Sequence, residues 1–172
     1  MGEIKSTLDL VFEKTKDLTL SDGEKIRLAR EKLEKRVRGL CNKYLDNFFP
    51  LSRLQDEMEK IAGNDRNLAY RSLTKHLFDH FDLDGENSLI MSALTKIARR
   101  DINSLTNLQK AYNSEKEGAK KAFIEKSLLA LQERGVSGSA VVSNLETIPE
   151  WNEFLTTLRK KYREQLQAIE NS

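Results

Sequence analysis

Residues 21–48 read SDGEKIRLAREKLEKRVRGLCNKYLDNF, the longest uninterrupted helical pattern in the chain. Ser21 and Glu24 have the spacing of a capping box, in which each side chain accepts a hydrogen bond from the backbone amide of the other. The apolar residues that follow recur at every third or fourth position: Ile26, Ala29, Leu33, Val37, Leu40, Tyr44 and Phe48. This spacing keeps them on one helix face, and Pro50 ends the pattern. We therefore predict a rod of roughly 40 Å with its apolar stripe buried along the whole length.

The C-terminal half of this rod is wider on its apolar side, because Cys41 and Leu45 join the stripe there. We expect two neighbouring helices over that half and one over the N-terminal half. Cys41 is the single cysteine, so no disulfide can form within the chain, and a reducing compartment is indicated. Charged residues from Glu3 to Lys14 interrupt any signal-peptide core, and no later window has the length of an apolar membrane span. The expected location is the cytoplasm.

The composition is typical of long helices. Of 172 residues, 33% are charged and only two are proline. We predict an all-α fold, an elongated helical bundle of five to seven helices with at least two long helices, as a single domain over residues 1–172. The net charge of +2 is the difference between 29 basic and 27 acidic residues. A chain so nearly neutral has no general affinity for nucleic acid, so any electrostatic partner must contact a local patch.

Similar spacing predicts helices elsewhere in the first half of the chain. In residues 4–18 the apolar positions form a strict seam: Ile4, Leu8, Val11, Thr15 and Leu18. Such a seam packs along one other helix, which is either the 21–48 rod or a helix of a second copy in a homo-oligomer. A short helix is predicted over residues 51–61. Two more form a helical hairpin around the turn at residues 82–87.

The second half is predicted to contain two long helices. Residues 101–134 include no proline, so we favour one helix that begins at Asp101 as its N-cap over two helices joined near Gly118. Residues 135–148 have the composition of an irregular linker. The last helix is expected to follow a second capping box, Thr147 to Glu150, with proline in its first turn.

Two segments resemble a known family. The opening run MGEIKSTLDLV at residues 1–11 and the segment GVSGSAVVSN at residues 135–144 are similar to those of small, uncharacterised, all-helical bacterial proteins. The family has no established activity, so the resemblance implies a helical fold and no particular chemistry.

The only two histidines form a candidate metal site. His76 and His80 are one helical turn apart, and Asp79 lies between them. The pattern is similar to the histidine pair of inverted zinc proteases, with aspartate in place of the catalytic glutamate and without an evident third ligand. The alternative is a pair of histidines at the edge of an apolar stripe, in contact with water.

Other chemical motifs are weak. The turn from Asp82 to Leu89 resembles a calcium loop, but Asn87 replaces the glycine and Ala93 the bidentate glutamate, so a hairpin turn explains it better. Ser137 and Ser139 lack the strand and the second glycine of a nucleophile elbow. We therefore expect no enzyme activity and no cofactor.

Basic residues concentrate in two places. Candidate contacts to nucleic acid or to the ribosome are Arg27, Arg30, Lys35, Arg38, Arg159, Lys160 and Arg163. If the two helix faces adjoin, they can hold phosphates, with Tyr162 available for stacking. The alternative is a solvated face, because Glu24, Glu31 and Glu34 alternate with the first cluster and can pair with it.

The linker contains an apolar run that a simple connection does not require, Ala140, Val141 and Val142. This run either plugs the end of the bundle or binds a partner, and small apolar residues beside glycine favour the plug slightly. The leading functional hypothesis is a non-enzymatic, cytoplasmic interaction or regulatory module that binds a protein partner. A nucleic-acid or ribosome-associated factor is the alternative, followed by a metal-binding protein.

Overall fold

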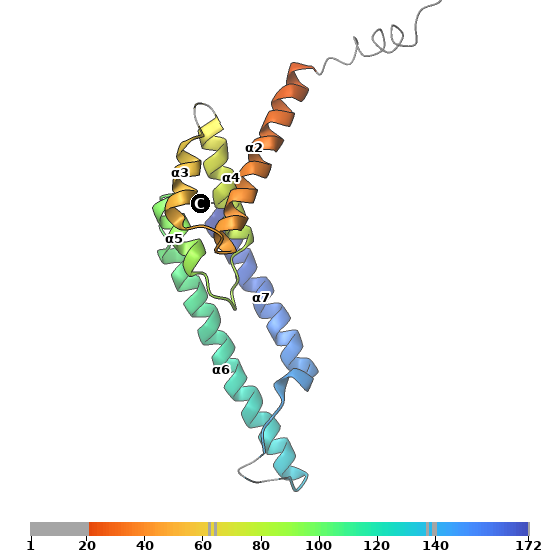
Figure 1. Ribbon diagram of the computed structural model, residues 1–172. Helices are drawn as coiled ribbons and strands as arrows, with labels where there is room; N and C mark the ends of the chain where they lie inside the picture. Colours follow the sequence, from red (N-terminus) through yellow and green to blue (C-terminus); the bar gives the residue numbers. More distant parts are fainter. Residues whose placement is uncertain (1–20, 62, 64, 137, 139–140, 172) are drawn as a thin grey trace, which may run out of the picture.

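The computed structural model describes residues 21–61, 63, 65–136, 138 and 141–171 (Figure 1). The described part of the chain is helical and contains no strand, which confirms the all-α prediction. The α-helices are α2 (Asp22–Leu45), α3 (Leu51–Glu59), α4 (Asp65–Asp79), α5 (Ser88–Lys96), α6 (Asn103–Glu133) and α7 (Pro149–Glu170). A single 3₁₀ turn, η1 (Leu145–Thr147), precedes α7. The seam over residues 4–18 lies outside the described residues.

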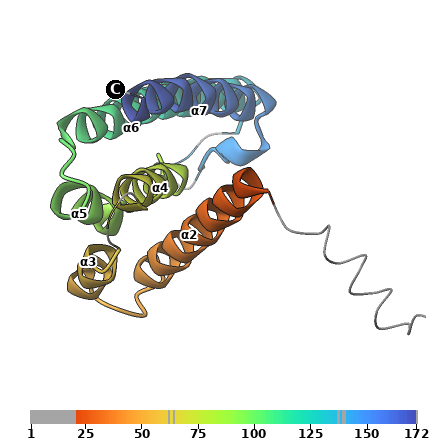
Figure 2. The same ribbon diagram turned by 90° about the horizontal axis from the view of Figure 1, so that it is seen from above.

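The molecule consists of a small body and two projections. Helices α3, α4 and α5 form the body together with the C-terminal half of α2, and α4 lies between α2 and α7 (Figure 2). The N-terminal half of α2 leaves the body in one direction, and the antiparallel α6–α7 hairpin leaves it in the other (Figure 1). No helix in the described ranges combines the length and the apolar character that a membrane span requires.

Helix α2 begins as predicted and ends earlier. The Ser21 Oγ accepts from the Glu24 amide at 3.3 Å, and the Glu24 Oε2 accepts from the Ser21 amide at 2.8 Å, so the capping box is confirmed. The last helical residue is Leu45, because Asn47 adopts a left-handed conformation with φ 59°. The side chain of Phe48 is consequently 77% exposed, and its predicted place on the buried stripe is wrong.

Only the C-terminal half of the α2 stripe is buried. Val37, Cys41 and Tyr44 are inside, where α3 and α4 both pack against α2 as predicted. By contrast, Ile26 is 55% exposed, and Ala29 is exposed as well. No other described element lies beside the first turns of α2 (Figure 1). Helix α4, which begins at Asp65, starts nearer to the body than these turns do. The prediction of a stripe buried along the whole rod is therefore wrong for the described chain.

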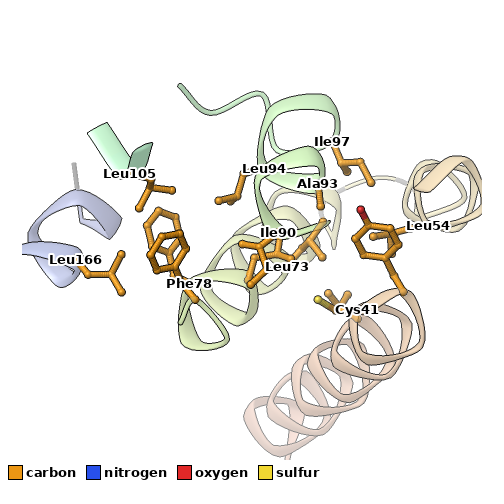
Figure 3. Packing of buried hydrophobic residues seen from close by; sticks show 14 of the residues in the cluster. Cys41, Leu54, Leu73, Phe78, Ile90, Ala93, Leu94, Ile97, Leu105 and Leu166 are labelled. Carbon is orange, nitrogen blue, oxygen red and sulfur yellow. The ribbon is translucent and has the colours of Figure 1, made fainter. Parts of the chain in front are cut away.

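The core lies around α4 and α5. Figure 3 shows Leu73 and Ile90 at its centre, between Cys41 and Leu54 on one side and Phe78 on the other. Helices α6 and α7 close the far side with a further set of buried side chains: Leu105, Leu108, Tyr112, Leu158, Tyr162 and Leu166. The hydroxyl of Tyr44 donates to the carbonyl of Leu89 at 3.0 Å, so this buried polar atom is satisfied.

The predicted boundaries of the long helices are partly correct. Helix α6 is continuous through Gly118, as we favoured, but its N-cap is Ile102. The Asp101 carboxylate accepts from the amide two residues further on, that of Asn103. Pro149 opens α7 as predicted. The second capping box is wrong, because Thr147 belongs to η1 and its hydroxyl donates to the carbonyl of Asn144.

Candidate functional site

The turn between α4 and α5 is held by a buried asparagine. The Asn87 side chain is only 4% exposed, and its Nδ2 donates to the Asp82 carbonyl at 2.6 Å and to the Gly85 carbonyl at 3.3 Å. Its Oδ1 accepts from the Asp82 amide at 3.0 Å. The side chain of Gln109 on α6 donates to the same Gly85 carbonyl at 2.9 Å. These bonds fix the turn against α6.

Asp84 projects from this turn and joins it to both helices of the hairpin. Its Oδ1 accepts from the Tyr112 hydroxyl at 2.9 Å and from the Lys116 ammonium at 2.6 Å, both on α6. Its Oδ2 accepts from the Arg159 Nη2 at 3.0 Å and from its Nε at 3.1 Å, on α7. A calcium ion at this carboxylate would have to displace two cations, so the resemblance to a calcium loop has no functional basis in this geometry.

The same bonds set the ionisation of Asp84. Partial burial acts to raise the pKa of its carboxyl, but hydrogen bonds from Lys116, Tyr112 and Arg159 together outweigh burial and leave the pKa lowered. The carboxylate therefore stays ionised at neutral pH. Its role here is structural, because all four bonds go to residues of the same chain.

A second carboxylate joins α6 to α7 on the outer side. Glu115 accepts from the Lys161 ammonium at 2.7 Å and from the Tyr162 hydroxyl at 2.9 Å. The rings of Tyr112 and Tyr162 meet edge to face, with centroids 5.4 Å apart. Charged and aromatic contacts thus fix the register of the hairpin where it leaves the body.

Further along the hairpin, an aromatic cluster replaces the charged contacts. Phe123 on α6 lies edge to face with Trp151 on α7, with ring centroids 5.4 Å apart, and Trp151 stacks on Phe154 at 5.7 Å. Trp151 is only 6% exposed although it lies far from the main core. The hairpin is therefore packed beyond the body and can act as a rigid arm.

We call residues 125–153 the hairpin tip, the end of this arm. Three large apolar side chains are exposed on it: Leu129 at 61%, Val136 at 47% and Val142 at 85%. Of the apolar run predicted to plug or to bind, Val141 is half-buried and Ala140 lies outside the described residues. In this part of the hairpin, Leu145 in η1 and Trp151 in α7 are buried. Val142 is thus not packed against the described part of the fold, and its contact with a partner stays a prediction.

The two basic clusters do not form one surface. Helix α4 separates the face of α2 that carries Arg27, Arg30, Lys35 and Arg38 from the face of α7 that carries Lys160 and Arg163 (Figure 2). Arg159 is engaged by Asp84, and Arg27 lies 3.8 Å from Glu31. The structure therefore gives two separate basic faces with fewer free cations than the sequence suggested.

The candidate metal ligands come together only in part. The rings of His76 and His80 have centroids 4.3 Å apart, but the His80 Nδ1 lies 2.9 Å from the His76 carbonyl oxygen, and the His76 Nε2 lies 2.6 Å from the Asn42 Oδ1. The Asp79 carboxylate accepts from Lys75 at 3.2 Å. Across the described ranges, no three His, Cys, Asp or Glu side chains form a group that could hold a metal ion. Metal binding by this pair stays a prediction.

The electrostatic environment of His76 is positive. Burial lowers its pKa, and the charges of His80, Arg38 and Lys75 lower it further, while Asp79 opposes them. The ring is consequently neutral at pH 7. Sequence patterns did not reveal that His76 on α4 meets Asn42 on α2, because helical spacing does not show which faces of two helices meet.

No protein-family model, no curated protein and no solved structure matches the chain. The functional argument therefore depends on the geometry of the described residues.

Proposed function

We propose that the protein is a non-enzymatic, cytoplasmic interaction module whose hairpin tip binds a protein partner. The observation that carries this proposal is the exposure of Leu129, Val136 and Val142 at the end of a packed helical arm. Exposed apolar side chains are typical of protein-binding surfaces where they form one contiguous patch, and we propose that these three form such a patch at the tip. The aromatic cluster and the two carboxylate clusters support the arm, so that it can present these side chains without reorganising.

The charges of the tip indicate the chemistry of the partner. Between Glu125 and Glu153 the chain carries five acidic residues, Glu125, Glu133, Glu146, Glu150 and Glu153, and two basic residues, Lys126 and Arg134. An apolar surface with an acidic border is complementary to an apolar recess bordered by lysine or arginine. The proposed partner is a protein with such a recess.

Two further observations support a role without catalysis. Cys41, the single thiol, is fully buried, and burial raises its pKa to about 12, so it stays protonated and unreactive. Asp84 and Glu115 each accept from several donors, which lie on neighbouring helices. These groups hold the fold and are not available for a substrate.

Capture of partners from the native cell tests the proposal with matched variants. Leu129→Asp and Val142→Asp place a charge at the tip, whereas Phe48→Asp places the same charge on the exposed corner between α2 and α3. All three sites are exposed, so each variant should keep the helical circular dichroism of the wild type. We expect the tip variants to lose a protein that the wild type and Phe48→Asp retain. Loss of that protein with Phe48→Asp alone, or its equal retention by all variants, would reject the hairpin tip as the binding site.

A further inference from the structure

A groove between α2 and α4 is a second feature that the proposed function does not use. Arg38 lines it from α2, and Arg71, Ser72, Lys75 and His76 line it from α4. Cationic and hydroxyl donors from two packed helices therefore converge on one concave surface. Such convergence differs from an ordinary solvated helix face, where charged side chains diverge into water.

The two arginines of this groove are not neutralised. Within the ranges that the structure describes, neither Arg38 nor Arg71 forms an ion pair or a side-chain hydrogen bond. By comparison, Arg36 forms an ion pair with Glu57 and Arg159 forms one with Asp84. Two guanidinium groups without ion pairs at one groove can each donate two hydrogen bonds to the oxygens of an anion.

The acidic residues of the groove do not cancel this capacity. Asp79 is paired with Lys75 at 3.2 Å, and that pair is largely exposed to water. Glu34 is exposed at the edge, one turn before Arg38 on α2. Within the described residues neither carboxylate forms an ion pair with Arg38 or Arg71, and these two arginines, which are also exposed, approach the groove from opposite helices.

We propose that this groove binds the phosphate group of a phosphorylated ligand, with Arg38 and Arg71 as the principal contacts. Ser72 donates its hydroxyl to a phosphate oxygen. Arginine suits this task because its planar fork pairs with two phosphate oxygens at once. The site is separate from the hairpin tip and goes beyond protein binding there.

Calorimetry with inorganic pyrophosphate provides the first test. The double variant Arg38→Gln, Arg71→Gln removes the two principal contacts, and Arg27→Gln, Arg30→Gln removes the same charge from the part of α2 outside the groove. We expect the groove variant to bind pyrophosphate at least about tenfold more weakly than the wild type, and the control variant to bind as the wild type does. Equal weakening in both variants, or no binding by the wild type, would overturn the proposal.

The source of the phosphate is distinguished with oligonucleotides. A short RNA that carries a 5′-phosphate is compared with the same RNA that ends in a hydroxyl. Preference for the phosphorylated RNA, lost in the groove variant, identifies a nucleic-acid end as the ligand. Binding of pyrophosphate with no such preference identifies a small phosphorylated molecule.

A measurement on the wild-type protein keeps the test independent of variant folding. His76 and His80 are the only histidines, so each gives one resolvable ring signal. The groups that face His76 are Asn42, Arg38 and Glu34 on α2 and Lys75, Asp79 and His80 beside it. Pyrophosphate in the groove should shift the ring signal of His76, because His76 lines the groove. An unchanged His76 signal at saturating pyrophosphate would contradict the site.

Discussion

The carboxylate of Asp84 accepts two hydrogen bonds from the guanidinium of Arg159, at 3.0 and 3.1 Å, across 75 positions of sequence. The other oxygen of Asp84 accepts from Tyr112 and Lys116 on α6. One side chain in a turn of the body thus contacts both helices of the hairpin. The orientation of the arm relative to the body depends on this residue.

Replacement of Asp84 by asparagine should destabilise the protein by about 1–3 kcal/mol. The neutral amide cannot satisfy Lys116 and Arg159, although the half-exposure of Arg159 to water limits the loss on that side. Urea unfolding of Asp84→Asn and wild type measures the difference. As a control, Asp79→Asn removes an exposed pair with Lys75 and should change the free energy of unfolding by less than about 0.5 kcal/mol. Equal losses of stability in Asp84→Asn and Asp79→Asn would contradict the structural role given to Asp84.

The clusters of Asp84 and Glu115 should make the protein sensitive to acid. Both carboxyl groups have a lowered pKa in the folded state, Asp84 from 3.8 and Glu115 from 4.5. The unfolded chain then binds more protons, so their stabilisation is complete above these ordinary values and is lost as the pH falls through the folded ones. Urea unfolding at about pH 7 and at about pH 3 should show that Asp84→Asn loses less stability on acidification than the wild type does. A parallel loss in both would contradict the assignment.

The two halves of α2 should respond differently to truncation. Val37 is fully buried, so Val37→Ala should cost about 2 kcal/mol through lost burial and a cavity. Ile26 is 55% exposed, so Ile26→Ala should stay within about 0.5 kcal/mol. Thermal and urea unfolding of the two variants provide the comparison. A large loss for Ile26→Ala would show that something covers the N-terminal half of α2.

The buried Asn87 should be more important than its place in a turn suggests. Asn87→Ala leaves the Asp82 amide and carbonyl without their partners, which should cost about 2 kcal/mol. Ser88→Ala is the neighbouring control, because the Ser88 hydroxyl bonds only the exposed Glu86 carboxylate. Hydrogen exchange should also quicken at the Asp82 amide in Asn87→Ala. Unchanged stability and exchange would show that water can replace the side chain.

Local signals in the sequence predicted the local features of the fold. The Ser21 and Glu24 spacing located the start of α2, and the absence of proline predicted that α6 continues through Gly118. The widening of the stripe at Cys41 also predicted the two neighbours of the C-terminal half of α2. Each of these features depends on residues within a few turns of one another.

Features set by tertiary packing were not predicted. Periodicity marks an apolar face but does not show which part is covered, so the exposure of Ile26 was missed. The pairing of Asp84 with Arg159 depends on how the hairpin docks, and no spacing in the sequence encodes it. For the same reason, the sequence left open whether the two basic clusters adjoin, and the structure places α4 between α2 and α7. The exposure of Val142 is visible only in the structure, and its contact with a partner stays a prediction.

Photo-crosslinking in the native cell tests the central claim, binding of a protein at the hairpin tip, most directly. A photoreactive residue at position 142 probes the tip, and one at the exposed position 55 on α3 probes the opposite part of the molecule. We predict one discrete crosslinked protein from position 142 and not from position 55, with the yield reduced at least about tenfold by Leu129→Asp. The same product from both positions, or a yield from position 142 that does not depend on Leu129, would contradict the account.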